Sequence, residues 1–393
     1  MRNFRDLAGI ACLAAGVSLV GCGGNQAQDM SGYNSRSMDG PASQVSSGTS
    51  FGAATLGAKL IPLQGKPSFV LGVNVPSFGG QVGREFGKNA LLPDSEVSYN
   101  AKQVNTNLQD ISSSGFNVVR LRLFSKLDGL KVDAAGLVTG VDEALYKNVS
   151  DLLSKAENSK VQIYVCLSGP WTGTAGVKNP LMDVAARTAY LKKAVTPLIG
   201  KLKGRPSVFA VSISDGIETE IAGKDGNSTK VGATWDQARD FVKANLDIIK
   251  SVDPQRLISC GSALHGWQNV KAGKLSRLGL DFYDFQVLDD KGILPPFKEI
   301  KVDRPALIGS CGQDSKKSDN AVQSKAIMTL LGNAEKLGYA GAILSEYSKD
   351  ADNPLGLLDK DGKHRPVFAD LQSFSATLAM NATTAPIAGQ PKL

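Results

Sequence analysis

Polar and aromatic side chains recur within or shortly after short apolar runs of the sequence, where they could bind or transform a polar ligand. These residues are Asn74, Arg120, Arg122, Trp171, Asp215, Glu218, His265, Trp267, Gln286, Ser310, Cys311 and Glu346. Carboxylate, amide and guanidinium groups form hydrogen bonds with hydroxyl groups, and indole rings pack against apolar C–H faces. This mixture of side chains favours a carbohydrate ligand.

The same residues would gather at one end of a barrel if the apolar runs are parallel strands. Each run is short and rich in β-branched or aromatic residues, as buried parallel strands are. The eight predicted strands are Phe69–Val75, Asn117–Phe124, Val161–Leu167, Val208–Ile213, Arg256–Gly261, Phe282–Leu288, Ala306–Gly309 and Gly341–Leu344. With helices between them, they predict a single α/β domain, a (β/α)8 TIM barrel over residues 67–375, with its chemistry at the C-terminal strand ends. An open, doubly wound sheet is the alternative architecture.

Helical periodicity lies between most of the predicted strands. Apolar residues recur on one face in three stretches, Leu145 to Ala156, Ala238 to Ile249 and Ala326 to Leu337. The second stretch ends before Pro254, which cannot continue a helix. The third ends at Gly338, the residue type favoured in a left-handed C-cap.

The sequence contains no pattern that indicates a nucleotide cofactor, a metal site or a nucleic-acid partner. Neither of the two glycine-rich phosphate-binding patterns, GxGxxG and GxxxxGK(S/T), follows a predicted strand, so we expect no nucleotide cofactor. With two histidines and no CxxC pair, we also expect no metal site. Lys and Arg exceed Asp and Glu by 44 to 37, a net charge of +7, but no basic run indicates a nucleic-acid partner.

The first 22 residues have the organisation of a bacterial export signal. Arg2 and Arg5 precede an uncharged apolar run from Leu7 to Val20, which is too short to span a bilayer. The run ends in Leu-Val-Gly-Cys and resembles the bacterial lipobox, in which the chain is cut before the cysteine and its thiol is acylated. We therefore predict a lipoprotein signal peptide over residues 1–21 and lipidation of Cys22.

A lipid on Cys22 would place the protein in a bacterial cell envelope, anchored to a membrane. Gly23 follows the cysteine in place of Asp, and by resemblance to the lipoprotein sorting rule this implies the outer membrane of a two-membrane bacterium. Residues 22–66 contain few large apolar side chains and are predicted to form a flexible tether. Residues 376–393 are predicted to form a flexible tail. An envelope protein is a further candidate partner.

Three cysteines remain within the predicted barrel, Cys166, Cys260 and Cys311. All three lie in apolar segments, and an odd number allows at most one disulfide. We predict that they are three buried, small hydrophobic residues.

Several short segments, in order along the chain, resemble glycoside hydrolase family 5 and the clan A barrels generally. The segments are Gly72–Asn74, Gly115–Arg120, Pro206–Ala210, Leu280–Phe285, Arg304–Gly309 and Asp359–Gly362 followed by Arg365-Pro366. The resemblance implies a retaining glycosidase. In that family a Glu at the end of strand 4 and another at the end of strand 7 act as acid/base and nucleophile, with their carboxyl groups about 5–5.5 Å apart.

The sequence departs from this family pattern at both catalytic positions. The strand 4 position falls on Gly216, within Asp215-Gly216-Ile217, and the strand 7 position falls on Ser310. The family's strand 6 histidine falls on Gln286. A hydroxyl group needs an adjacent base to act as a nucleophile, so Ser310 alone does not replace the glutamate. The residues that keep family-like identities are Asn74, Arg120 and Trp267.

Other residues could replace the missing carboxylates. Glu218 lies two residues beyond the strand 4 position and Glu346 follows strand 8, so they form an alternative acid and nucleophile pair. The competing interpretation is that both are paired or solvated carboxylates of the rim. A Cys311–His265 pair is a weaker alternative, because a thiolate nucleophile needs a close base.

The predicted saccharide-binding residues are Asn74, Arg120, Trp171, Asp215, Trp267 and Gln286. Two interpretations stay open for some of them. Trp171 and Trp267 either stack on sugar rings or anchor loops by packing. Arg120 either contacts the ligand or braces the mouth of the barrel.

The leading hypothesis is a degenerate, non-catalytic glycosidase of the cell envelope that binds a poly- or oligosaccharide or scaffolds an envelope partner. The alternative is an active retaining glycoside hydrolase that acts on a β-linked polysaccharide through Glu218 and Glu346. An unrelated envelope function on the same barrel is the third hypothesis, because a fold does not determine a function.

Overall fold

The computed structural model describes residues 60–384, except 93, 168–170, 225, 227–229, 264–265, 288–293, 315–318 and 350–352. The predicted signal peptide, Cys22, the tether up to residue 59, His265 and the tail from residue 385 lie outside the described residues.

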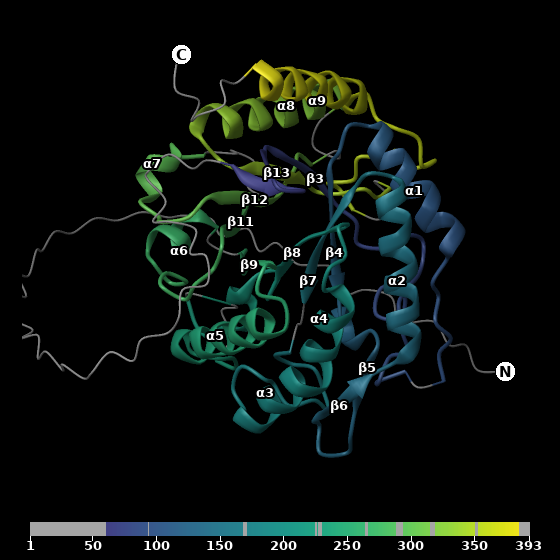
Figure 1. The fold of residues 1–393 in the computed structure, drawn as a ribbon, viewed down its shortest axis with the longest axis vertical. Helices are drawn as coiled ribbons and strands as arrows, with labels where there is room; N and C mark the ends of the chain where they lie inside the picture. Colours follow the sequence, from purple (N-terminus) through teal and green to yellow (C-terminus); the bar gives the residue numbers. More distant parts are fainter. Residues whose placement is uncertain are drawn as a thin grey trace, which may run out of the picture. The chain divides into compact units, whose positions relative to one another are not determined.

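The predicted (β/α)8 barrel is confirmed. Parallel strands follow one another in the order β10-β11-β12-β13-β3-β4-β7-β8-β9. β9 and β10 are two parts of the fifth barrel strand, separated only by Cys260, so their pairings with β8 and β11 close the sheet (Figure 1). The strands are β3 (Val70–Asn74), β4 (Val118–Leu123), β7 (Gln162–Leu167), β8 (Val208–Ser212), β9 (Leu257–Ser259), β10 (Gly261–Ser262), β11 (Tyr283–Val287), β12 (Ala306–Cys311) and β13 (Gly341–Leu344). All eight predicted strands are therefore present.

Helices pack around the barrel and bury the apolar faces seen in the sequence. The buried residues of α2 are the predicted stripe from Leu145 to Ala156. Gly338 caps α8 with a φ of 94°, the left-handed conformation expected there. The helices are α1 (Ala101–Ser113), α2 (Glu143–Asn158), α3 (Val184–Tyr190), α4 (Thr196–Leu202), α5 (Trp235–Val252), α6 (Trp267–Lys271), α7 (Phe297–Ile300), α8 (Asn320–Leu337) and α9 (Val367–Thr384). Shorter turns of helix are η1 (Ser125–Leu127), the π-helical η2 (Leu191–Val195) and η3 (Ile217–Glu220). In Figure 1, α8 and α9 lie together at the top, and α1 and α2 at the right.

A hairpin of β1 (Ile61–Leu63) and β2 (Lys66–Ser68) precedes the barrel. Ile61 and Leu63 are buried in one cluster with barrel residues such as Tyr164 and Phe282. The prediction that the tether continues to residue 66 was therefore wrong at its end. A three-residue strand with two apolar side chains is too short to be recognised in the sequence. These two side chains close the N-terminal end of the barrel.

The C-terminal boundary of the barrel also differs from the prediction. Helix α9 continues to Thr384, beyond residue 375, where the barrel was predicted to end. Its first turns bury Val367, Phe368 and Leu371, and Phe374 packs edge-on against Phe69 with ring centroids 6.1 Å apart. Among the described residues, none of the helices has the length and apolar character needed to cross a bilayer.

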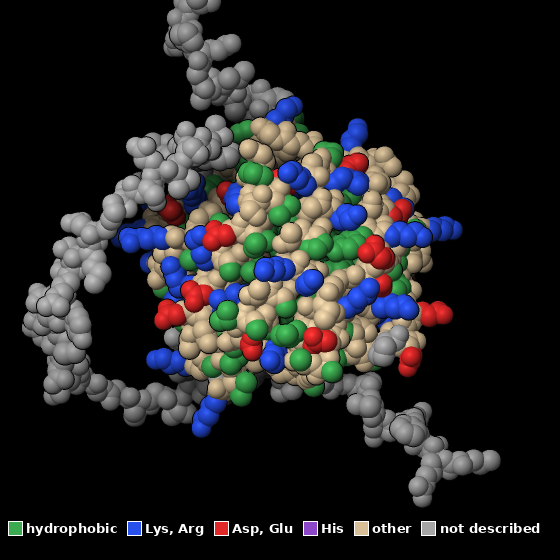
Figure 2. Space-filling view, turned by 60° about the horizontal axis from the view of Figure 1, so that its bottom comes forward, with side chains coloured by type: hydrophobic (Ala, Val, Ile, Leu, Met, Phe, Trp, Pro, Cys, Tyr) green, Lys and Arg blue, Asp and Glu red, His purple; other side chains and the backbone are tan. Residues whose placement is uncertain are grey.

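The three barrel cysteines are free and buried, as predicted. Burial raises the pKa of Cys166 and of Cys311 to about 12, so these thiols stay protonated at neutral pH. On the surface, Lys and Arg side chains are interspersed with Asp and Glu on the face shown in Figure 2.

Candidate functional site

The C-terminal strand ends bring together five of the predicted residues. The Asn74 amide donates to Ser310 Oγ over 3.4 Å, and its Oδ1 accepts from Arg120 over 3.3 Å. Gln286 Nε2 donates to the carbonyl oxygen of Asp215 over 3.1 Å. Residues from β3, β4, β11 and β12, and from the segment after β8, thus form one polar network at the mouth of the barrel.

Arg120 lies at the centre of this network, and its guanidinium group is shared by two carboxylates. It forms a salt bridge with Asp215 and a second one, of 3.4 Å, with Asp284 Oδ2. The hydroxyl of Tyr164 donates to the same Asp284 oxygen over 2.8 Å. Because Arg120 is only 3% exposed, it braces the mouth in this structure, which is one of the two interpretations left open by the sequence.

The two carboxylates have opposite pKa shifts. Burial would raise the pKa of Asp215, but the charges of Arg120 and Arg122 outweigh it and hold this pKa below its usual value. Asp284 is wholly buried in the barrel interior, and this burial raises its pKa despite the attraction of Arg120. The two arginines therefore favour the ionised form of Asp215, whereas burial opposes the ionisation of Asp284.

Asp284 was missed as a functional residue in the sequence. The sequence does contain a pattern that indicates its position. Side chains alternate between the two faces of a strand, so Asp284 lies on the same inward face of the barrel as Phe282 and Gln286. A carboxylate on the inward face of a barrel strand needs a buried partner.

Gly216 and Ser310, to which the sequence resemblance assigns the two catalytic positions, carry no carboxylate and are closely packed. A Cβ atom added to Gly216 would lie 2.4 Å from the Cβ of Ala263, so the backbone here is packed against the segment after β10. Ser310 is 6% exposed and shares a short hydrogen bond with the hydroxyl of Ser345. Gly216 cannot take a side chain without rearrangement of Ala263, and the hydroxyl of Ser310 is already engaged with Ser345.

Glu218, the fallback acid, is fully buried and is occupied by structural hydrogen bonds. It accepts from the hydroxyl of Ser262, from the backbone N–H of Ala263 over 2.8 Å and from Asn269 Nδ2 over 2.6 Å. It thereby ties η3 to the loop after β10. Glu220 has a similar role, since its carboxylate accepts the backbone N–H groups of Trp171 and Thr172, each over 2.8 Å.

Glu346, the fallback nucleophile, lies half-buried in a polar cleft of about 1060 Å³. The cleft is enclosed by the β3–α1 loop, by α1 and by the segment after β13. Amide and hydroxyl side chains contribute to its walls, among them Ser77, Asn100, Gln103, Thr106 and Ser348. Glu218 is not among the residues that line this cleft, so the structure does not bring the two fallback carboxylates together there.

The lining of the same cleft includes a cluster of Asp110, Tyr347 and His364 that sequence reasoning did not find. Asp110 Oδ2 accepts from the hydroxyl of Tyr347 over 2.6 Å and lies 2.7 Å from Nε2 of His364. The His364 ring stacks on Phe368 with centroids 3.8 Å apart. Because Asp110 and His364 are 254 positions apart, no local pattern could have paired them.

The two predicted stacking tryptophans differ in exposure. Trp171 is 4% exposed and packs edge-on against Tyr190, with ring centroids 5.0 Å apart, so it serves as a loop anchor in this structure. Trp267 begins α6, is half-buried and has Nζ of Lys271 5.8 Å from its ring. Only Trp267 of the two presents part of its ring to solvent.

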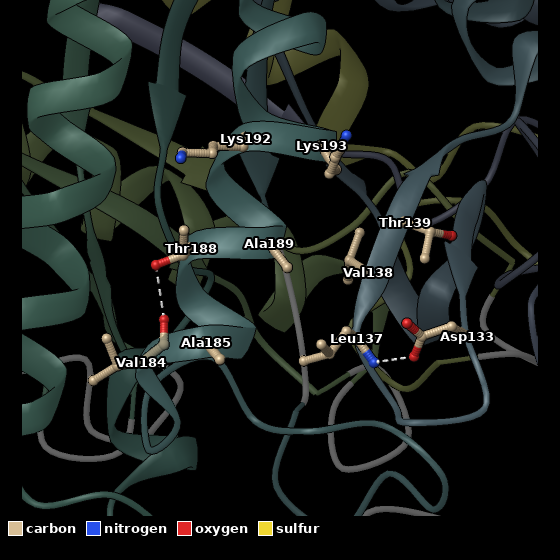
Figure 3. Close-up of a pocket in the computed structure, with 10 residues that line it drawn as sticks. All are labelled: Asp133, Leu137, Val138, Thr139, Val184, Ala185, Thr188, Ala189, Lys192 and Lys193. Atoms are coloured by element: carbon tan, nitrogen blue, oxygen red, sulfur yellow. Dashed lines mark hydrogen bonds between the residues drawn. The ribbon is translucent and has the colours of Figure 1, made fainter.

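A second hollow, shown in Figure 3, lies between α3 with η2 and the hairpin of β5 (Leu130–Val132) and β6 (Val138–Val141). Its volume is about 750 Å³, and aliphatic side chains such as Leu137, Val138 and Val184 form its walls. Its only carboxylate, Asp133, accepts the backbone N–H of Leu137 over 2.9 Å (Figure 3). A groove with one carboxylate, engaged in a turn, does not provide an acid and nucleophile pair.

Burial also argues against Cys311 as the nucleophile of the Cys311–His265 pair. Cys311 is fully buried and its pKa is raised to about 12, which opposes thiolate formation. In the described part of the chain, no three His, Cys, Asp or Glu side chains gather in a way that could hold a metal ion.

Comparisons with known proteins agree with this architecture. No family model matches the chain. It is 24% identical over 333 residues to the mannan endo-1,4-beta-mannosidase of Cryptopygus antarcticus, which covers 73% of this chain and 82% of that enzyme.

Solved structures with the same fold include several glycoside hydrolases. The β-1,4-D-mannanase of Cryptopygus antarcticus aligns with a TM-score of 0.63 and 19% identity, over 79% of this chain and 91% of that one. The β-mannanase of the blue mussel Mytilus edulis aligns with a TM-score of 0.59 and 18% identity, over 79% and 91%. GH5_18 from Streptomyces cattleya, solved with GlcNAc, aligns with a TM-score of 0.64 and 15% identity, over 82% of each chain.

The chain therefore has the (β/α)8 fold of family 5-type glycoside hydrolases, as the sequence resemblance implied. Within that class, β-mannanases are among the proteins it is similar to. At these identities the similarity establishes the fold.

Proposed function

We propose that this chain is a lipid-anchored protein of the bacterial cell envelope whose barrel binds a saccharide without hydrolysing it. The observation that carries this proposal is the state of the two family catalytic positions. Gly216 has no side chain and no room for one, and Ser310 is buried in a hydrogen bond with Ser345. Retaining hydrolysis needs two carboxyl groups on opposite sides of the scissile bond.

The remaining carboxylates do not favour replacement chemistry. Glu218 accepts hydrogen bonds from three groups and has no exposed surface. Asp215 is held between two arginines, which keep its pKa low and make it a poor general acid. A general acid for glycoside cleavage needs a raised pKa, and a lowered one removes the proton that the leaving oxygen requires.

Saccharide binding is favoured by the groups that remain exposed at the strand ends. Asp215 and Arg122 keep part of their polar surface, with 23% and 40% of the side chain exposed. Trp267 offers an apolar ring, and the cleft beside Glu346 offers amides and hydroxyls. Because the Cryptopygus antarcticus relative is a mannan endo-1,4-beta-mannosidase, a β-1,4-linked mannan is the first ligand to test.

The anchoring part of the proposal rests on the N-terminal sequence. The lipobox-like segment ending at Cys22 supports acylation, and the residue after it supports an outer-membrane position in a two-membrane bacterium. An envelope protein that docks on the barrel is the alternative partner if no saccharide binds.

A second candidate function is an active β-glycoside hydrolase. It is favoured by Glu346, whose half-buried carboxylate lies in a large polar cleft and accepts only a hydrogen bond of 3.0 Å from Ser348 among the described residues. This enzyme would use Glu346 together with Glu218, and the two carboxylates would have to come together in the substrate complex.

The first experiment measures turnover and binding on the same preparations. Purified protein is incubated with β-mannan and with aryl β-glycosides, and binding of manno-oligosaccharides is measured by calorimetry. We expect binding without release of reducing ends. Turnover that disappears in Glu346→Gln, while Glu335→Gln on the exposed face of α8 retains it, would overturn the proposal in favour of the hydrolase.

The second experiment locates the ligand with matched tryptophan variants. Trp267→Ala removes an indole at the start of α6, and Trp235→Ala removes one at the start of α5, where Nζ of Lys274 lies 5.2 Å from the ring. An aromatic contact contributes about 0.5–1.5 kcal/mol beyond burial, which is about 2- to 12-fold in affinity. Weakening by Trp267→Ala alone supports the site. Equal affinities in both folded variants would place the ligand elsewhere.

A further inference from the structure

A small pocket of about 250 Å³ lies near the N-terminal ends of β11 and β12, at the end of the barrel opposite the candidate site. Arg277 and Arg304 contribute to its walls, together with the side chain of Tyr283 and the backbone of residues 278–280. Its size suits a small polyatomic anion better than a sugar chain.

The two arginines of this pocket have no acidic partner. Arg277 is exposed and Arg304 is half-buried, and among the residues that the structure describes no carboxylate forms a salt bridge with either guanidinium group. The carboxylate in the lining, Asp303, instead accepts the hydroxyl of Tyr283 over 3.0 Å. Both arginines therefore keep donors for a ligand.

A third arginine shapes the pocket and adds to its charge. Arg239 on α5 donates to the carbonyl oxygens of Lys274 and Ser276, over 2.7 and 3.1 Å, and so holds the segment that leads to Arg277. Burial raises the pKa of Tyr283, while the positive charges of Arg304 and Arg239 lower it. Both arginines therefore act electrostatically on the Tyr283 hydroxyl. The segment that Arg239 holds in place carries Arg277, one of the two arginines that line the pocket.

We infer that this pocket binds a phosphate group, with Arg277 and Arg304 as its ligands. A guanidinium group offers paired N–H donors in a plane that match two oxygens of a phosphate. The backbone at Arg277 and Gly279 is left-handed, with φ of 59° and 94°, and curves the segment around the cavity. This site is separate from the saccharide function proposed above and does not depend on it.

The phosphate could be free or part of a lipid headgroup. The β1–β2 hairpin, which follows the predicted tether, closes the same N-terminal end of the barrel. A phosphodiester headgroup is therefore a ligand to compare with inorganic phosphate.

The test is calorimetric titration of the purified full chain in neutral detergent with inorganic phosphate and, separately, with glycerophosphoglycerol, a headgroup without acyl chains. We expect a single saturable site for at least one probe. Arg304→Gln and Arg277→Asn should each weaken it at least about tenfold, the usual effect of losing a charge-assisted hydrogen bond. Asn is chosen at position 277 because it tolerates a left-handed backbone.

The matched control is Arg84→Gln, which removes the same charge from another half-buried arginine, in the β3–α1 loop. It should leave the affinity within about twofold, since it removes a distant, screened charge. Tighter binding of the diester probe would identify the headgroup, and tighter binding of inorganic phosphate the free anion. No saturable binding of either probe at millimolar concentration, or equal weakening by Arg84→Gln, would overturn the inference.

Discussion

Replacing Arg120 by Leu tests whether the centre of the barrel mouth is a structural ion network. The substitution removes the only cation that contacts the carboxylate of Asp284 among the described residues. Asp284 would then be a fully buried carboxyl group with one remaining donor, the hydroxyl of Tyr164. Asp215 would keep Arg122 as its partner.

The expected loss of stability is large. Breaking a buried ion pair by removing one partner costs about 3–5 kcal/mol. Coulomb's law with an effective dielectric constant of about 20 gives an attraction of about 5 kcal/mol at the 3.4 Å between Arg120 and Asp284, which agrees in size. We therefore expect Arg120→Leu to reduce the free energy of unfolding by about 4 kcal/mol at neutral pH.

The loss should depend on pH. The pKa of Asp284 is already raised in the folded protein, so its contribution to stability is present at low pH and is lost as the pH rises through the folded pKa. Removing Arg120 raises this pKa further and steepens that loss. The same substitution removes part of the stability that the lowered pKa of Asp215 contributes above the usual carboxyl value of 3.8. The destabilisation should therefore be greatest near neutral pH and shrink toward pH 4.

Urea denaturation between pH 4 and pH 8 measures both effects. The double variant Arg120→Leu, Asp284→Asn should recover at least half of the loss and lose the part of the pH dependence that comes from Asp284, because it no longer leaves this carboxylate buried without a cation. Arg205→Leu, which breaks a partly exposed bridge of 2.9 Å to Glu157, is the control and should cost at most about 1 kcal/mol. A loss below about 1 kcal/mol for Arg120→Leu, or one that is the same at every pH, would refute the argument.

Three further predictions follow from the N-terminus, the buried glutamate and the thiols. Cys22→Ser should move the protein from the membrane fraction to the soluble fraction, and unchanged fractionation would contradict lipidation. Glu218→Ala should lower the free energy of unfolding by about 3 kcal/mol, because it leaves Asn269 and a backbone N–H without their acceptor; a stable variant in urea denaturation would speak against this role. Cys166 and Cys311, with pKa values of about 12, should resist iodoacetamide at pH 8 until the protein is denatured, as followed by mass spectrometry, and rapid labelling of the folded protein would show that they are accessible.

The strands and helices could be predicted because their signals are local. Runs such as Val161–Leu167 are mostly apolar on both faces, which is the pattern of a buried parallel strand, and the stripe of α2 follows the helical period. The assignment of the two family catalytic positions to Gly216 and Ser310 rests on the order of the motifs in the sequence and stays a prediction.

Element boundaries were predicted less well, because they depend on contacts with distant residues. The β1–β2 hairpin is ordered by burial of Ile61 and Leu63 against the barrel interior, and beyond residue 375 Leu378 of α9 packs against the hydrophobic core. Neither contact has a counterpart in the local composition of residues 61–66 or 376–384.

The roles of individual site residues were decided only by the tertiary structure. The sequence placed Arg120, Asp215 and Glu218 near the mouth of a barrel, but a residue type does not reveal how many partners its charge will meet. Asp284 and Arg120 are 164 positions apart, and Glu218 reaches Asn269 across 51 positions. Burial and hydrogen bonding at such separations arise only when the strands close into a barrel, and they decide which carboxylates remain free for a ligand.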